Sequence, residues 1–168
     1  MIQKKDTSEI INPINQLNLY GFNKYFNFFT NLYENNKLPN IILLSGLKGI
    51  GKATFIFHFI NYILSKDEEF KYSIKNFTID ENNSSYQMTT KNIHPNIFLL
   101  NQNSSTEITK IEHVKKLFKF LNSSTYKKNL KIIYIDNSEN LNINSSNALL
   151  KALEQPSPNT YFFIKLRL

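Results

Sequence analysis

Cysteine is absent from the chain of 168 residues, so a disulfide and a thiolate zinc site are both excluded. Long apolar runs are absent too, because the longest, such as residues 41–44, fall far short of the roughly 20 residues of a membrane span. The N-terminal segment contains no apolar core of the kind that a signal peptide needs. We therefore expect a soluble cytoplasmic protein with no zinc and no membrane partner.

Arginine is almost absent, since Arg167 is the single one, and lysine supplies nearly all of the net charge of +7. A basic chain is compatible with binding to nucleic acid or to an acidic protein. The abundance of asparagine, lysine, isoleucine and phenylalanine is equally typical of an AT-rich coding sequence, in which lysine replaces arginine without functional demand. The charge alone leaves both interpretations open.

Glycine is scarce as well, yet three of the four glycines lie within residues 46–51. The spacing Gly46-x4-Gly51-Lys52 is that of a P-loop, in which backbone N–H groups at a helix N-terminus point at phosphate oxygens. Residues 41–44 predict a strand buried on both faces before the loop, and residues 52–65 predict a helix after it. Strand, glycine loop and helix form the context that a P-loop requires.

The predicted nucleotide site has two parts. The first is the loop with the start of its helix, namely Gly46, Gly49, Gly51, Lys52, Ala53 and Thr54. The second is the end of a strand predicted over residues 131–136, where Asp136 stands in the place of a magnesium-orienting carboxylate and Asn137 follows it. Because aspartate at a strand end also caps turns, a purely structural role for Asp136 stays open.

Two substitutions weaken this predicted site. Ala53 stands where a Ser or Thr hydroxyl normally binds Mg²⁺, and Thr54 lies about 100° further around the helix. An active ATPase usually carries glutamate at the position of Asn137 to polarise the attacking water, and an amide cannot accept that proton. The sequence therefore predicts a site that holds ATP without hydrolysing it and that is poorly equipped for Mg²⁺.

The rest of the chain alternates between strand and helix patterns. Helices are predicted over residues 22–33, 52–65, 107–121 and 145–154, and strands over residues 41–44, 97–100, 131–136 and 160–164. This order predicts an α/β fold in which a parallel sheet has helices on both faces. Ligands of such sheets bind at the carboxyl ends of the strands, where Gly46 and Asp136 both lie. Residues 66–93 are predicted to be a loop-rich excursion with one short strand near residues 77–79.

Several side chains outside the glycine loop are candidates for core, catalytic or binding roles. The aromatic stripe of the first helix is interpreted as core and comprises Phe22, Tyr25, Phe26, Phe29, Leu32 and Tyr33. His58 is predicted to be packed, and His94 and His113 have no obvious carboxylate partner at ligand spacing. No Ser/His/Asp arrangement is visible. Four lysines on the helix over residues 107–121 form either a solvated face or a surface for nucleic acid: Lys110, Lys115, Lys116 and Lys119.

Four segments, residues 37–64, 94–100, 131–142 and 145–164, resemble the δ′ subunits of bacterial DNA polymerase III clamp loaders, which are members of the AAA+ family. The most specific stretch runs from Asn147 to Pro156 and is similar to the Asn-Ala-Leu-Leu-Lys-x-Leu-Glu-Glu-Pro signature of clamp-loader ATPase domains. The resemblance implies a P-loop core of the RecA-like AAA+ type. Gly46, Gly51 and Lys52 then match the Walker A frame, and Asp136 matches the Walker B aspartate.

The resemblance also implies a role. The δ′ subunits commonly have impaired Walker motifs and act as a stator in a ring whose other subunits hydrolyse ATP to open the sliding clamp. The implied partners are these other clamp-loader subunits and, indirectly through the complex, primer-template DNA. An active AAA+ ATPase, such as a clamp-loader motor subunit, is the alternative. Clamp-loader relatives often insert a four-cysteine zinc module in the region that corresponds to residues 66–93, which has no cysteine here.

The resemblance finally sets the expected domain organisation. Residues 1–168 are interpreted as a single AAA+ nucleotide-binding domain with a leader over residues 1–18. We expect the family's lid and collar domains to be absent, together with a fifth strand beside residues 41–44, whose absence would leave a sheet edge open. We therefore expect a domain that is incomplete at its C-terminal end.

Overall fold

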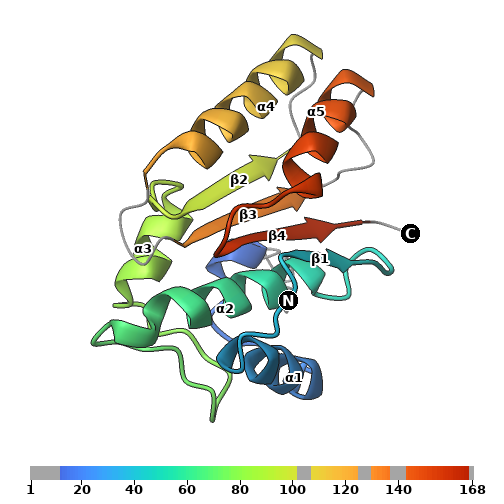
Figure 1. The fold of residues 1–168 in the computed structure, drawn as a ribbon. Helices are drawn as coiled ribbons and strands as arrows, with labels where there is room; N and C mark the ends of the chain where they lie inside the picture. Colours follow the sequence, from blue (N-terminus) through green and yellow to red (C-terminus); the bar gives the residue numbers. More distant parts are fainter. Residues whose placement is uncertain (1–11, 102–106, 125–129, 137–142, 167–168) are drawn as a thin grey trace, which may run out of the picture.

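A computed structural model describes residues 12–101, 107–124, 130–136 and 143–166. Four parallel strands form one sheet in the order β1-β4-β3-β2, as Figure 1 shows. The strands are β1 (Ile41–Leu44), β2 (Ile97–Asn101), β3 (Lys131–Asp136) and β4 (Thr160–Lys165). All four agree with the predicted strands to within one residue, and the predicted parallel sheet is confirmed.

Helices cover both faces of the sheet, as predicted (Figure 1). The helices are α1 (Asn23–Glu34), α2 (Lys52–Leu64), α3 (Ser84–Thr90), α4 (Glu107–Asn122) and α5 (Ile143–Glu154), with the 3-10 turns η1 (Pro13–Asn15) and η2 (Ser65–Asp67). The helices α1 and α2 pack on one face, and α4 and α5 pack on the other. Among the described residues, no helix is long and apolar enough to cross a membrane.

The central strand β3 shows how one sequence serves both faces. Successive side chains of a strand point to opposite sides, so Ile132 and Tyr134 join the core beneath α2 while Ile133 and Ile135 join the core beneath α4 and α5. All four are buried. Two apolar cores, one on each side of the sheet, explain why this strand reads as a continuous apolar run.

The prediction of burial on both faces is wrong for β1. Ile42 is buried against α2, but Ile41 and Leu43 are 38% and 57% exposed on the other face. The core beneath α4 and α5 includes residues of β2, β3 and β4 and none of β1. In the described part of the chain, β1 is thus an outer strand that the second helical layer does not reach.

The aromatic stripe of α1 is confirmed in part. Phe26 is fully buried and stacks on Tyr72, with ring centroids 5.0 Å apart. Tyr25 is 61% exposed, so its assignment to the core is wrong. The two neighbours differ because consecutive residues of a helix point about 100° apart, and α2 covers only the side that bears Phe26.

The excursion over residues 66–93 contains a helix that the sequence pattern did not predict. Asn83 caps α3, because its side-chain oxygen accepts a hydrogen bond of 2.6 Å from the Tyr86 N–H. The strand predicted near residues 77–79 is reduced to single bridges from Thr78 to Ser73 and Asn18. A short polar helix held by its cap has no apolar period, which is why periodicity missed it.

Candidate nucleotide site

The glycine loop joins the end of β1 to the start of α2, at the carboxyl end of the sheet (Figure 1). Gly46, Gly49 and Gly51 have φ angles of 150°, 88° and 92°, in the region that glycine adopts without strain. A Cβ atom added to Gly51 would lie 3.1 Å from the ring of Phe22. The loop therefore depends on its glycines for its path, and on Gly51 also for space.

Lys52 begins α2, and its side chain folds back over the loop. Its Nζ donates hydrogen bonds to the backbone oxygen of Leu47, at 2.7 Å, and to that of Gly46. The residue is only 7% exposed. Beside it, a Cβ atom added to Gly49 would meet no atom within 4 Å, so the loop borders open space. An ammonium at a helix N-terminus beside a glycine loop is the arrangement that receives phosphate groups.

The next two positions of α2 offer no replacement for a metal-binding hydroxyl after Lys52. Ala53 is buried and has no side-chain oxygen. Thr54 is half-buried and lies about 100° further around the helix, as the sequence predicted. The loss of a magnesium-binding hydroxyl at Ala53 stays a prediction. It rests on the side chain of Ala53, and Thr54 points in another direction.

Asp136 ends β3, and its carboxylate is paired with a cation from the protein itself. Lys165 Nζ lies 2.5 Å from Asp136 Oδ1, and the two side chains are 12% and 17% exposed respectively. Lys165 ends β4, the strand between β3 and β1, and is in register with Leu44, the last residue of β1. Asn137 and the turn that Asp136 would cap lie outside the described residues.

Strand alternation and one ring contact indicate that Ala53 and Asp136 lie on the same side of the sheet. Tyr134 packs against Phe57 of α2 with ring centroids 4.9 Å apart, so Asp136, two residues on, points to the same side of the sheet. From Phe57 back to Ala53 is one helical turn, and from Tyr134 to Asp136 is two strand positions. Each step covers about 6 Å toward the carboxyl end of the sheet. Ala53 is therefore on the same face of α2 as Phe57, the face that lies against β3.

These residues fit a phosphate group but not a magnesium ion. The glycine loop, the start of α2 and the Lys52 ammonium supply the donors that a phosphate needs. A magnesium ion requires oxygen ligands. A P-loop site takes them from a hydroxyl after the lysine and from a carboxylate at the end of another strand, here Asp136. Ala53 lacks the first, and the second is bound to Lys165.

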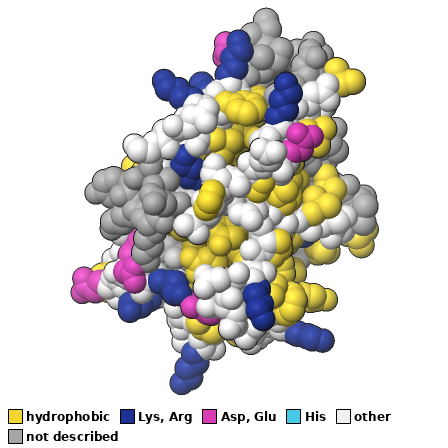
Figure 2. All heavy atoms as spheres, in the orientation of Figure 1, with side chains coloured by type: hydrophobic (Ala, Val, Ile, Leu, Met, Phe, Trp, Pro, Cys, Tyr) yellow, Lys and Arg dark blue, Asp and Glu magenta, His cyan; other side chains and the backbone are white. Residues whose placement is uncertain are grey.

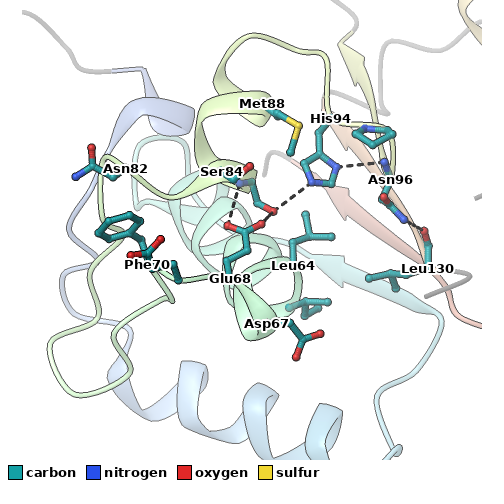
Figure 3. A pocket seen from close by; sticks show the side chains of 14 residues that line it. Leu64, Asp67, Glu68, Phe70, Asn82, Ser84, Met88, His94, Asn96 and Leu130 are labelled. Carbon is teal, nitrogen blue, oxygen red and sulfur yellow. Dashed lines mark hydrogen bonds between the residues drawn. The ribbon is translucent and has the colours of Figure 1, made fainter. Parts of the chain in front are cut away.

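A separate cavity of about 440 Å³ lies at the amino end of the sheet (Figure 3). Its walls come from the end of α2, from η2 and α3, and from the residues just before β2 and β3. Three consecutive carboxylates line it, those of Asp67, Glu68 and Glu69. Among the described residues, no cluster of histidine and carboxylate groups could hold a metal ion.

The cavity wall contains a hydrogen-bonded chain that sequence reasoning missed. Ser85 donates to Glu68 through its hydroxyl and, at 3.1 Å, through its backbone N–H. His94 Nε2 lies 3.2 Å from Ser85 Oγ, and His94 Nδ1 accepts from the Asn96 N–H at 3.1 Å (Figure 3). Only the folded chain brings these residues together, since they have no fixed spacing in the sequence.

The proton positions in this chain differ from those of a catalytic triad. Because His94 Nδ1 accepts from a backbone N–H, its proton is on Nε2 and is donated to Ser85. The Ser85 hydroxyl then donates to Glu68, whereas a nucleophilic serine must donate to the histidine. His94 is therefore linked to the Glu68 carboxylate through Ser85, a partner without ligand spacing that the sequence did not predict, and the arrangement serves to hold α3.

His58 is packed, as predicted. It is fully buried in α2, with Nε2 2.9 Å from the Gln16 carbonyl oxygen and Nδ1 3.0 Å from the Tyr72 hydroxyl. Nε2–H donates to the carbonyl, so Nδ1 accepts from Tyr72. Burial lowers the pKa of His58 to about 4, which keeps the ring neutral at physiological pH.

The lysines proposed as a surface for nucleic acid are exposed where the structure describes their side chains. These are Lys115, Lys116 and Lys119 of α4, whereas the side chain of Lys110 lies outside the described residues. Figure 2 shows the basic side chains of this view spread from one end of the molecule to the other, not gathered into one patch. This distribution is typical of a solvated surface.

Comparison with known proteins gives one consistent result. The family model described as DNA polymerase III, delta subunit, matches residues 21–166. Three curated relatives are each named DNA polymerase III subunit delta'. The Pseudomonas aeruginosa protein is 28% identical over 46% of this chain and 24% of its own length. The Haemophilus influenzae protein is 31% identical over 43% of this chain and 22% of its own length.

The third relative extends the match along the chain. The Escherichia coli K12 protein is 22% identical over 80% of this chain and 39% of its own length, so less than half of each relative is matched. A solved structure of a DNA polymerase III gamma subunit-related protein from Thermotoga maritima is 21% identical. It covers 44% of this chain and 24% of that chain, with a TM-score of 0.38, which is too low to bear on the fold.

Proposed function

The chain belongs to the family described as DNA polymerase III, delta subunit, and we propose that it is a δ′-type clamp-loader subunit that binds nucleotide without hydrolysing it. The three relatives named as delta' subunits support the first part of this proposal. One observation carries the second part: Ala53 supplies no hydroxyl after Lys52, and the Asp136 carboxylate is paired with Lys165.

The physical basis is the nature of phosphoryl transfer. Catalysis of this reaction comes almost entirely from positioning and from charge stabilisation around the transferred phosphoryl group. A loop that holds phosphates but has no ligand set for the divalent ion retains binding and loses the charge that speeds transfer. The glycine loop then serves to give the subunit a fixed shape, with or without nucleotide.

The proposed partners are the other subunits of a clamp loader, and primer-template DNA is contacted through that complex. In this role the chain supports loading of a sliding clamp in DNA replication while neighbouring subunits hydrolyse ATP. The exposed lysines of α4 are assigned no direct part in DNA binding, because a run of lysines on a helix is most often a solvated face.

The test measures ATP hydrolysis by the chain and its assembly with clamp-loader subunits. The purified chain is assayed for Mg²⁺-dependent ATP hydrolysis, alone and reconstituted with its clamp-loader partners. We expect no turnover by the chain alone, and unchanged clamp loading when Lys52→Ala is introduced into the complex. Lys48→Ala, which alters an exposed lysine of the same loop, is the matched control.

Clear turnover by the chain alone that Lys52→Ala abolishes and Lys48→Ala preserves would establish the alternative, an active AAA+ ATPase. Failure of the chain to enter a complex with clamp-loader subunits would contradict the proposed role itself. The two results are read in separate assays, so each part of the proposal is tested independently.

A further inference from the structure

We infer that the Lys165 ammonium takes the role that a magnesium ion has in other P-loop sites, so that this site accepts nucleoside polyphosphates free of metal. The inference rests on the proposed binding of nucleotide at the glycine loop. It concerns a residue that the P-loop motif does not include, because Lys165 comes from β4.

The position of Lys165 is set by the sheet. The strand β4 lies between β1, which leads into the glycine loop, and β3, which ends in Asp136. Lys165 is paired in register with Leu44 on one side, and its side chain contacts Asp136 on the other. Phe163, two residues earlier, packs in the core beneath α2, so Lys165 points to the same side as the start of that helix.

The ion pair of Lys165 with Asp136 competes with a metal. Both side chains are largely shielded from water, at 12% and 17% exposure, so their attraction is screened less than that of a surface pair. A magnesium ion at Asp136 would have to displace the ammonium and then remain next to it. Without the hydroxyl that Ala53 lacks, the ion would gain too few oxygen ligands to offset that repulsion.

The charges at the carboxyl end of the sheet remain favourable for an anion. Lys52 and Lys165 carry two ammonium groups, and Asp136 carries the one carboxylate described between them. One positive charge is therefore left over for phosphate. An ammonium has three N–H donors, and the Lys165 ammonium contacts Asp136 through a single oxygen. The N–H donors that point away from Asp136 can bind phosphate oxygens.

The experiment measures ADP binding to the full chain by calorimetry, once with excess Mg²⁺ and once with excess EDTA. For the unmodified protein we expect dissociation constants that agree within about twofold. Lys165→Met, which keeps the length of the side chain and removes its charge, should weaken binding in EDTA by about tenfold. Lys165→Arg should retain metal-free binding, and Lys48→Met is the control for an exposed charge of the same region.

A second variant covers the case in which Lys165→Met does not fold. The double substitution Asp136→Asn with Lys165→Met removes both charges and leaves no unpaired carboxylate. It should unfold at nearly the temperature of the unmodified protein and still lose metal-free ADP binding. Thermal unfolding followed by circular dichroism checks the fold of every variant before titration.

Two results would overturn the inference. One is ADP binding by the unmodified protein that strengthens more than about threefold with Mg²⁺, and the other is unchanged affinity of Lys165→Met in EDTA. Absence of ADP binding under both conditions would also overturn it. That last result would leave the clamp-loader role intact, because the role is tested by assembly with partner subunits.

Discussion

At the carboxyl end of the sheet, the ammonium groups of Lys52 and Lys165 lie near the glycine loop. At the amino end, Glu68, Ser85 and His94 form a chain of hydrogen bonds. The first set has donors to spare and borders open space. The second set is closed, because each group is the partner of the next. We therefore assign ligand binding to the carboxyl end of the sheet and stability to the amino end.

The largest effect on stability should come from the amino end. Asn83 is fully buried, and its side chain accepts from Asn61 and Tyr86 and donates to the Phe70 oxygen at 2.6 Å. We expect Asn83→Ala to lower the free energy of unfolding by about 3 kcal/mol, because it removes a cap and leaves buried groups unpaired. Chemical denaturation measures this change.

The neighbour Asn82 is the matched control for this prediction, since it is exposed. Asn82→Ala should change the free energy of unfolding by less than about 0.5 kcal/mol. Equal effects of the two substitutions would contradict the assignment of the amino end of the sheet to stability.

A stability effect of similar size should appear when the pH is lowered. The pKa of His58 is held at about 4 by burial, below the ordinary value of 6.5. The stability that neutral His58 contributes is therefore fully present above pH 6.5 and is lost as the pH falls toward 4. Between these two values only the unfolded chain takes up the proton. The loss should be about 3 kcal/mol, measured by denaturation at several pH values.

His58→Gln is the control for the pH profile. Glutamine can donate to the Gln16 carbonyl oxygen and does not titrate, so the variant should show a flatter profile between pH 6.5 and 4 even if it is less stable overall. An unchanged slope would show that other groups cause the loss.

A smaller effect on stability is expected from the glycines of the loop. Gly51→Ala combines a φ of 92° with a contact of 3.1 Å to Phe22, and should cost about 2 kcal/mol. Gly49→Ala has a similar φ of 88° but enters open space, so it should cost about 1 kcal/mol. Thermal unfolding of both variants isolates the effect of crowding, and a reversed order would refute it.

The smallest effect on stability should accompany a large loss of binding. Lys52→Ala removes hydrogen bonds to two loop carbonyls that can turn to water, which should cost about 1 kcal/mol or less. ADP affinity should fall at least about tenfold, since an ammonium that binds the phosphates is lost. If Lys52→Ala destabilised the fold more than Asn83→Ala, the division of tasks between the two ends would be wrong.

The sequence predicted the strands, the order of the fold and the glycine loop because each of these depends on local patterns. Apolar runs such as residues 131–136 and the spacing from Gly46 to Lys52 need no knowledge of distant contacts. The outward face of β1 could not be predicted, because Leu43 reads like any buried strand residue until the reach of α4 and α5 is known.

The same limit applies within the site. Ala53 and Asp136 were predicted from motifs, but the partner of Asp136 was not, since Lys165 belongs to another strand and becomes its neighbour only through the sheet order. The chain from Glu68 to His94 is a further case, because no spacing rule links a carboxylate, a serine and a histidine on three different segments.

The hydrogen bonds of Lys52 to its own loop have a consequence for any ligand that arrives. With its ammonium seated on the oxygens of Gly46 and Leu47, the loop already holds a cation that an incoming phosphate must draw away. The affinity for phosphate therefore reflects a competition for the Lys52 ammonium between the phosphate and the two backbone carbonyl oxygens. We therefore expect strongly charged phosphate compounds to bind better than weakly charged ones, because only the former offset the hydrogen bonds that Lys52 gives up.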